Sequence, residues 1–573
     1  DAYLKGLRDY DADEAFRAMV RTSNRSDFSK NFNAKNGFVS LDIEPESVSK
    51  ALEYSYDDFC IAQMAKSMGN RGLSSEYNRR AMSFINHFDD SAQFFRARRS
   101  GMWMGSFRPE EVNFNYTEAN AWQYSLFAPH AIGILDKLHR NDLEGHLNQL
   151  FEVSSKTSGR DQADITGLIG QYAHGNEPSH HMAYLFNYVN RPDLTQKYVD
   201  SILFNLYQNE PDGLSGNEDC GQMSSWYVLS SMGLYPMSPG RPYYEFGRPI
   251  CNEATLHLEN GNNLNVIVLN QGKKNKYIRN VFFNGEILNR NYIAHEELMR
   301  GGELRFEMMD KLPAKFSSNT NAPTLTNVDE NFVPLPYFIN ENRVFDEKLT
   351  VTMDIPDWRE KSKFKIEVKT AANDDWKEYE AYVINADVTI WARTINIETK
   401  QTSEVVKADF FKKNNNISLE LISKYANQYN AGGDNALIDG ISGGNEYRTG
   451  DWQGYYGEDI NGILYIDDAK MKLGLKIGLL EDLKSWIYYP QSIEIAVSFD
   501  GKKFEKTKTF KLEKSPQDYR PSESKQYSVD LEETKPIKAI RFSIKNPGVL
   551  PNWHLGAGNP SWIFVDEIKL LTK

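Results

Sequence analysis

The spacing of hydrophobic residues along the chain changes near residue 238. Before this position the spacing is helical: apolar residues recur every three or four positions from 47 to 69, where Gly69 ends the run. Turns with Pro and Gly, such as Pro211-Asp212-Gly213, separate the helical segments. A series of helices with short connections predicts paired helices in a bundle or a helical barrel over residues 1–237. Further helices are predicted at 74–88, 118–138, 178–189, 193–207 and 220–233.

From residue 238 the hydrophobic period is two, which is typical of strands. Asn284-Gly285 is a strong signal for a hairpin between two of them. We assign residues 238–312 to a β segment that closes the helical region. Residues 313–335, rich in Pro, Asn and Thr, are assigned to a linker. The strands of this segment are predicted at 256–258, 264–269, 277–283 and 303–308.

Two further β units follow the linker. Residues 336–405 form a short unit, with strands predicted at 349–353, 364–368 and 388–392. Residues 410–573 form the last unit, in which a turn at Asp500-Gly501 follows one of the strands. Many short strands with regular turns predict a sandwich or jelly roll. The fold class is therefore multidomain α and β. Strands of the last unit are predicted at 464–466, 473–477, 493–499, 540–544 and 562–568.

Composition excludes several classes of function. The chain has 66 Lys+Arg and 79 Asp+Glu, a net charge of −13, so no basic stripe is available to bind nucleic acid. No apolar run approaches the roughly 20 residues that span a bilayer. Cys60, Cys220 and Cys251 are too scattered for a disulfide framework or a thiolate metal site.

Three acidic segments precede or open predicted helices. Glu118 lies in 116–123, Glu177 in 174–181, and Glu218 with Asp219 in 216–222. Helix capping is the simpler explanation for any single segment. However, the segments are rich in Gly, Asn, Gln, His and Trp, which hydrogen-bond or stack on sugars. Alternate helices of a barrel begin at one rim, so these carboxylates can converge on one site.

Such a set of carboxylates is what glycoside hydrolysis requires. One carboxylic acid protonates the leaving oxygen, and a second carboxylate activates water or attacks directly. A separation of about 6.5–9.5 Å leaves room for water and gives inversion. A helix N-terminus favours the ionised form, so the acid needs apolar shielding or a neighbouring carboxylate to raise its pKa. Tyr116 and Trp122 are the expected shields of Glu118.

Four motifs in order give the helical half a family resemblance: 52–60, 116–124, 170–178 and 216–227. Over about residues 1–312 the chain resembles glycoside hydrolase family 92, the calcium-dependent exo-acting α-mannosidases. The resemblance implies an (α/α)6 barrel, mannose-containing glycans as substrates and hydrolysis with inversion. It also implies that Glu118 is the general acid and Asp219 the general base. Asn217 lies beside them, where many members have Asp.

The resemblance also implies a bound Ca²⁺, with Asn176, Glu177 and Gln222 as candidate ligands. Members that cleave α-1,2 linkages tend to have Glu where Gly175 stands. This disfavours α-1,2 and leaves α-1,3, α-1,4 or α-1,6 open. The two adjacent histidines are as well explained by an internally hydrogen-bonded structural pair. Candidate substrate-binding residues are Trp122, His174, Gly175, His180, His181 and Glu218.

Family members begin with a β-sandwich domain and early barrel helices that do not appear in this sequence. We therefore expect a partial barrel and a separate N-terminal segment that completes it. The alternative is a catalytically incomplete glycan-binding or adhesion protein. The substrate class and the module types fit a secreted, periplasmic or surface-attached bacterial protein.

The two C-terminal units resemble accessory modules of carbohydrate enzymes. Residues 336–405 are similar to the immunoglobulin-like domain that ends some hexosaminidases. Residues 410–573 resemble a discoidin-type (coagulation factor 5/8 C-terminal) module, through 436–440, 452–455 and 493–501. Such modules often bind sugars through loop aromatics, although buried Trp is the usual case in sandwiches. The candidates here are Trp452, Tyr455, Tyr456 and Trp553.

Overall fold

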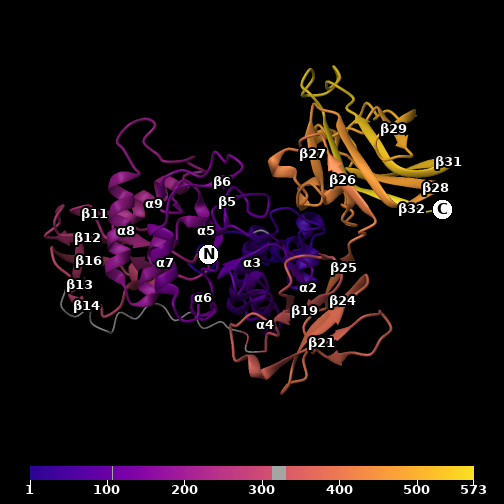
Figure 1. Cartoon of the computed structure of the whole chain (residues 1–573). Coiled ribbons are helices and arrows are strands. Elements are labelled where there is room, and N and C mark those ends of the chain that lie inside the picture. The colour runs from indigo at the N-terminus through magenta and orange to yellow at the C-terminus, as the bar shows by residue number, and fades with distance from the viewer. Residues whose placement is uncertain (106, 313–328, 330, 573) are drawn as a thin grey trace.

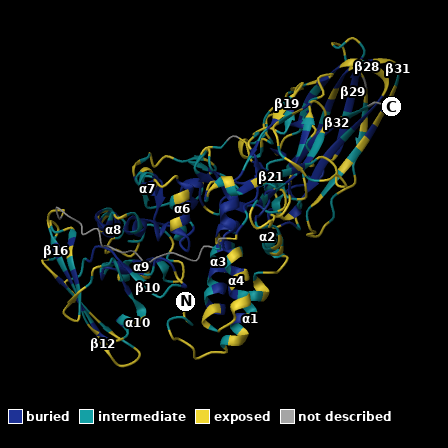
Figure 2. Ribbon diagram, turned by 90° about the horizontal axis from the view of Figure 1, so that it is seen from below, coloured by how far each residue is buried: buried dark blue, intermediate teal, exposed yellow. Residues whose placement is uncertain are grey.

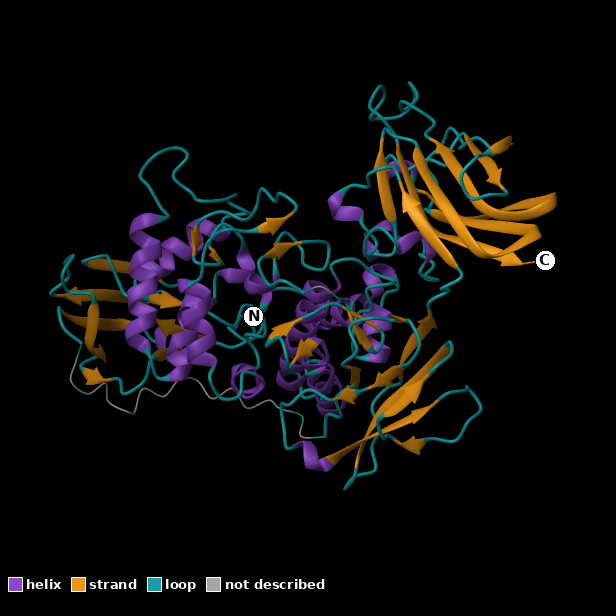
Figure 3. Ribbon diagram, viewed as in Figure 1, coloured by secondary structure: helices purple, strands orange, loops and turns teal. Residues whose placement is uncertain are grey.

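The computed structural model describes residues 1–105, 107–312, 329 and 331–572. Helices lie in the middle of the molecule, with one sheet on one side and two β-rich units on the other (Figures 1 and 3). Most of the predicted linker, 313–328 and 330, lies outside the described residues. Within the described part of the chain, no helix is both long enough and apolar enough to cross a membrane.

The helical region packs around one large hydrophobic core. Its longest helix, α3, runs from Ser47 to Ser67, and buried residues cover much of its length (Figure 2). Burial of apolar side chains contributes roughly 25 cal/mol per Å² to stability. The other helices are α1 (Ala12–Thr22), α2 (Lys30–Asn36), α4 (Arg71–Arg80), α5 (Ala121–Tyr124), α6 (Ile132–Leu138), α7 (Leu143–Glu152), α8 (Pro192–Asn205) and α9 (Gln222–Ser231).

The predicted helices at 47–69, 193–207 and 220–233 are confirmed as α3, α8 and α9. The prediction at 118–138 is wrong in its extent: α5 begins at Ala121, ends at Tyr124, and α6 starts only at Ile132. Pro129 lies in the gap and lacks the backbone N–H that a continuous helix requires. The segment predicted as a helix at 178–189 forms two 3-10 helices, Glu177–Ser179 and Met182–Val189. The segment predicted at 74–88 begins within α4 and ends in a 3-10 helix, Ser83–His87.

The β segment at 238–312 forms a five-stranded sheet in the order β11-β12-β16-β13-β14. Asn284 and Gly285 have φ of 50° and 86°, as the predicted hairpin between β13 and β14 requires. The sheet packs against α8, where Gln196 accepts a hydrogen bond from the backbone N–H of Ile278 at 2.8 Å. The strands are β11 (Glu253–His257), β12 (Asn263–Leu269), β13 (Tyr277–Phe283), β14 (Glu286–Ile287) and β16 (Gly302–Met309).

The next unit contains a five-stranded sheet in the order β18-β25-β24-β21-β22. Its strand β25 ends at Lys412, beyond the predicted boundary at 405. Strand β17 (Tyr337–Phe338) pairs in parallel with β4 (Met102–Trp103), so this unit is joined to the helical region by backbone hydrogen bonds. The sheet strands are β18 (Val344–Phe345), β21 (Phe364–Lys369), β22 (Lys377–Glu378), β24 (Val388–Asn396) and β25 (Val406–Lys412).

The last unit is a seven-stranded, mainly antiparallel β structure with its own hydrophobic core. The predicted strands at 464–466 and 473–477 are parts of one long strand, β28 (Ile460–Glu481). Asp451 forms ion pairs with Arg99 at 2.6 Å and Arg343 at 3.1 Å, which link all three regions. The other strands are β26 (Ile417–Leu421), β27 (Gln453–Tyr456), β29 (Ser492–Ser498), β30 (Glu505–Lys511), β31 (Glu523–Lys545) and β32 (Trp562–Thr572).

Candidate active site

Glu118 and Asp219 both occupy strained turns. Their φ angles are 51° and 48°, and Cys220 and Gly221 continue the second turn at 57° and 90°. A residue with a Cβ in the left-handed region costs roughly 1–2 kcal/mol, and such strain concentrates at functional sites. Both carboxylates are exposed. Neither caps a helix, because Asn120 caps α5 and Glu218 accepts from the first turn of α9.

One pair of neighbouring residues connects the two carboxylates. Asn176 Nδ2 donates to the Glu118 carbonyl at 3.3 Å and to Glu118 Oε2 at 3.5 Å. The next residue, Glu177, has its carboxyl group against that of Asp219. Burial raises the pKa of Glu177, and the charges of Asp219 and Glu118 raise it further. The structure therefore brings Glu118, Glu177 and Asp219 into one acidic site.

The environment of Glu118 raises its pKa. Burial is the largest cause and the charge of Asp164 is the next, while the Asn176 amide opposes them. The sequence predicted Tyr116 and Trp122 as shields, but both lie in the packed interior. Tyr116 donates to a backbone carbonyl at 2.6 Å, and Trp122 packs between two other rings. Partial burial and the charge of Asp164 take the place of aromatic shielding, and Trp122 is buried in the core.

Asp164 is the site residue that sequence analysis missed. Asn217 Nδ2 donates to Asp164 Oδ1 at 3.2 Å, and the Gln162 amide donates to the other carboxylate oxygen. Asp164 lies in an irregular loop, where no period or motif marks a functional side chain. Its role depends on contacts with residues distant in sequence, which a single sequence does not display.

Glycines allow three segments of this site to approach closely. The backbone N–H of His174 donates to the Gly167 carbonyl at 3.1 Å, and that of Gly175 to the Thr166 carbonyl at 3.1 Å. A Cβ at Gly175 would lie 1.9 Å from Thr166 Oγ1, and one at Gly216 would lie 2.5 Å from the Gly175 carbonyl. Backbone hydrogen bonds and close packing thus hold together the segments that carry Asp164, Glu177 and Asp219.

A family model, that of the glycosyl hydrolase family 92 catalytic domain, matches residues 1–310, which include the whole acidic site. The chain belongs to glycosyl hydrolase family 92. This confirms the family predicted from the four motifs.

Family 92 relatives include proteins with solved structures. A family GH92 α-mannosidase of Bacteroides thetaiotaomicron, solved with mannoimidazole, is 34% identical, with a TM-score of 0.52, over 54% of this chain and 42% of that one. A family GH92 inverting mannosidase of that species is 32% identical, with a TM-score of 0.49, over 54% and 45%. An uncharacterized secreted glycosidase of Arthroderma benhamiae is 26% identical over 54% of this chain and 44% of its own length. The chain spans less than half the length of these relatives.

The three predicted histidines are buried and hydrogen-bonded. His174 lies between the hydroxyls of Tyr172 and Tyr207, each at 2.7 Å. His180 donates from Nε2 to the His174 carbonyl at 2.9 Å, and its Nδ1 lies 3.2 Å from Gln222 Nε2. Burial lowers the pKa of His180 and of His181 to about 4. These rings are neutral near pH 7 and contribute hydrogen bonds to the packing around the acidic site.

Two other predicted residues are occupied by local contacts. Glu218 accepts from the Ser224 backbone N–H at 3.0 Å and from its hydroxyl at 2.8 Å, so it stabilises the start of α9. This is the capping role that the sequence left open. Gln222 turns its amide nitrogen toward His180. Among the described contacts, neither the Glu218 nor the Gln222 side chain forms a hydrogen bond with the side chain of Glu118 or Asp219.

The chemistry of the donor set fits a calcium ion in part. Calcium prefers several oxygen ligands, and the Glu177 and Asp219 carboxylates lie against each other, where a cation would offset their repulsion. Of the predicted ligands, Glu177 fits best, because Asn176 contacts Glu118 and Gln222 contacts His180. Among the described residues, no group of three or more His, Cys, Asp or Glu side chains could hold a metal. Backbone, amide, water or sugar oxygens would therefore complete the set.

The aromatic candidates of the last unit divide into two groups. Trp452 and Tyr455 are 1% and 0% exposed, so they cannot stack on a sugar, and the structure corrects that prediction. They pack in the sandwich core, the alternative that the sequence left open. Tyr456 is exposed and packs against Trp562, and half-buried Trp553 packs against Tyr519.

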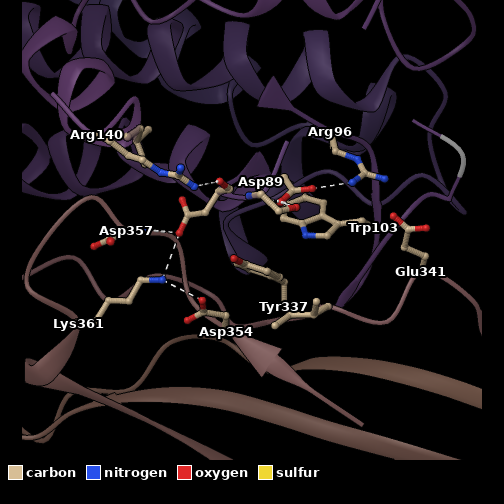
Figure 4. Close-up of a pocket in the computed structure, with 13 residues that line it drawn as sticks. Asp89, Arg96, Trp103, Arg140, Tyr337, Glu341, Asp354, Asp357 and Lys361 are labelled. Carbon is tan, nitrogen blue, oxygen red and sulfur yellow. Dashed lines mark hydrogen bonds and ion pairs between the residues drawn. The ribbon is translucent and has the colours of Figure 1, made fainter. Parts of the chain in front are cut away.

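Two cavities lie in the described part of the chain, and only one of them is next to the acidic site. One, of about 290 Å³, lies between the helical region and the second β unit (Figure 4). It contains the Asp89–Arg96 ion pair at 2.6 Å and Lys361 with Asp354 at 2.9 Å, and no predicted site residue lines it. The other, of about 460 Å³, is lined in part by Gln162 and lies next to the acidic site.

Proposed function

We propose that this family 92 chain acts as an exo-α-mannosidase that hydrolyses terminal α-mannosyl linkages with inversion and calcium assistance. The observation that carries the proposal is the joining of Glu118 and Asp219, in two strained turns, through Asn176 and Glu177. Family membership and a 34% identical α-mannosidase bound to mannoimidazole supply the substrate class.

The proposed reaction assigns one proton transfer to each carboxyl group. Glu118, whose pKa is raised, gives its proton to the glycosidic oxygen as the bond to the anomeric carbon breaks. Asp219 accepts a proton from the water that attacks the opposite face of that carbon. The products are mannose of inverted configuration and the released alcohol. Asn217, adjacent to this turn, helps to hold the water.

A calcium ion would supply a hard Lewis acid for sugar hydroxyls. The carboxylates of Glu177 and Asp219 would hold it. Its charge would also relieve the repulsion that raises the pKa of Glu177.

The linkage preference is proposed from Gly175. Thr166 Oγ1 fills the space that any side chain at this position would need. The Glu typical of α-1,2-cleaving relatives is absent here, so we propose α-1,3, α-1,4 or α-1,6 linkages as substrates. We further propose that the β units are the immunoglobulin-like and discoidin-like modules that the sequence suggests, with Tyr456 and Trp553 as sugar contacts, in a secreted, periplasmic or surface protein.

The test is release of mannose from α-1,3- and α-1,6-mannobiose and an aryl α-mannoside, with Ca²⁺ and with a chelator. Proton NMR of the first product should show the β-anomer. Binding of mannobiose without release would support the alternative, a glycan-binding protein. If release required an added N-terminal family 92 segment, that segment would be the partner predicted from the sequence.

A further inference from the structure

Asp164 is a carboxylate that contacts Asn217, two residues before Asp219 of the acidic site. Its two oxygens accept from the side-chain amides of Asn217 and Gln162. In the part of the chain that the structure describes, no Lys or Arg forms an ion pair with it. A carboxylate kept for stability is normally compensated by a cation or by backbone N–H groups, as Asp58 is by Arg80 at 2.9 Å.

The loop that carries Asp164 is fixed in place. Backbone hydrogen bonds join Thr166 to Gly175 and Gly167 to His174, and a Cβ at Gly167 would lie 2.6 Å from Ser215 Oγ. The segments on the far side of these contacts contain Glu177 and Asp219. Because the loop cannot move away from them without breaking this packing, Asp164 has one location relative to the acid and the base.

Asp164 also acts on Glu118 through space. The charged groups near Glu118 include Asp164, Glu46, Asp219 and Glu177. Among the charges that raise its pKa, that of Asp164 has the largest effect. Glu46 lies before α3 and Asp219 before α9. Asp164 thus contacts Asn217 directly and adds negative charge near Glu118.

We propose that Asp164 is a positioning residue: held by Gln162, it orients the Asn217 amide toward the attacking water. The inference rests on the proposed hydrolysis. It adds a residue from a loop outside the two turns that carry the acid and the base. Since Asn217 donates through its amide nitrogen, its carbonyl oxygen remains the group available to accept from water.

The test compares three variants of the full chain with a matched control. Asp164→Asn removes the charge, and the double variant Asp164→Asn with Asn217→Asp exchanges carboxylate and amide while keeping a hydrogen-bonded pair. Asp161→Asn removes the same charge from an exposed position of the same loop. Gln162→Leu releases Asp164 from its second partner.

Asp164→Asn is expected to lower kcat about ten- to hundredfold, as typical for supporting residues, and to leave KM nearly unchanged. The melting temperature should not fall, because the variant removes like-charge repulsion. The exchange variant should recover part of the loss in kcat, and Asp161→Asn should behave as wild type. Gln162→Leu should give an intermediate loss.

An unchanged kcat in Asp164→Asn would overturn the proposal. So would a fall in melting temperature that the exchange variant repairs without repairing kcat, since that marks a structural role. If wild type releases no mannose, the proposed function fails separately. The positioning is then judged by ¹⁵N NMR of the Asn217 side-chain amide, whose signal should shift in Asp164→Asn and stay constant in Asp161→Asn.

Discussion

Thr166 Oγ1 lies 1.9 Å from the point that a Cβ at Gly175 would occupy. A contact this short requires the neighbour to move, and the Ser215 carbonyl, 3.0 Å from the same point, limits that movement. Gly175→Ala is therefore expected to destabilise the fold by about 1–3 kcal/mol through overpacking. Urea unfolding measures this loss, and mannose release should fall with it because the Asp164 loop is displaced.

The control for this prediction is another glycine. Gly133, in α6, has nothing within 4 Å of its potential Cβ, so Gly133→Ala should be neutral or stabilising by up to about 1 kcal/mol. Adding Thr166→Gly to Gly175→Ala should recover part of the stability. Equal stability of the two single alanine variants would contradict the packing described.

Glu118→Gln tests the proton donor through the leaving group. A general acid contributes typically 10²–10⁴-fold, and it is needed most when the leaving alcohol is poor. The variant should therefore lose at least about a hundredfold in kcat/KM on mannobiose and much less on a nitrophenyl mannoside. Steady-state kinetics on both substrates make the comparison. An equal loss on both would reject the assignment.

Asp219 and Cys220 share a left-handed turn, so their substitution by glycine separates strain from chemistry. Each change relieves roughly 1–2 kcal/mol of left-handed strain, and the greater freedom of glycine in the unfolded chain offsets roughly 0.5–1 kcal/mol of this, so a small net stabilisation is expected for each. Cys220→Gly should retain activity, whereas Asp219→Gly should lose it. Thermal unfolding and mannose release of the two neighbouring variants give the answer. A destabilised Cys220→Gly would show that the thiol has a structural role.

The long helices and the strand-rich half could be predicted because the spacing of hydrophobic residues indicates whether a segment is a helix or a strand. The apolar stripe of α3 and the alternation of β16 are local properties of the chain. The turns at Glu118 and Asp219 could not be predicted in the same way, because a positive φ leaves no periodic trace in non-glycine residues. Sequence placed Glu118 in a helix that begins only at Ala121.

The site residues also divide into those that local motifs predict and those whose role depends on contacts distant in sequence. Glu118, Glu177 and Asp219 lie in motifs that could be read directly, and the structure joins them. Asp164 could not be found, since its hydrogen bond to Asn217 spans 53 positions. The burial of Trp452 also depends on distant packing, because aromatic composition does not say whether a ring faces solvent or core.

The last β unit should lose stability as the pH rises. Burial raises the pKa of Glu567 to about 8, of Asp439 to about 7 and of Asp566 to about 6. An acid whose folded pKa is raised binds its proton more tightly when folded, so its contribution is full below about pH 4 and is lost as the pH rises toward 8. Calorimetry between pH 5 and 8 should show a falling melting temperature.

Glu567→Gln provides the control for this pH dependence. The amide carries no titrating proton, so the variant should flatten the curve, by on the order of 2 kcal/mol near pH 8 after allowing for solvent access. Glu532→Gln should leave the slope nearly unchanged, since that side chain is 71% exposed. A slope that Glu567→Gln leaves intact would mean that the buried carboxylates of this unit do not govern its stability.

Asp451 is expected to hold the three regions together. It accepts from Arg99 of the helical region and from Arg343 of the second β unit, and its side chain is only 9% exposed. Asp451→Asn leaves two cations without their counter-charge, in a setting where burial already lowers the pKa of Arg343. Removing one member of such a buried set costs roughly 3–5 kcal/mol, and somewhat less here because both arginines retain contact with water.

In calorimetry, Asp451→Asn should melt earlier and in more separated steps. The control is Asp468→Asn, which removes an exposed partner of Lys470 and should change stability by less than about 1 kcal/mol. Matching melting curves for the two variants would show that backbone pairing between β17 and β4, rather than this charge cluster, joins the regions.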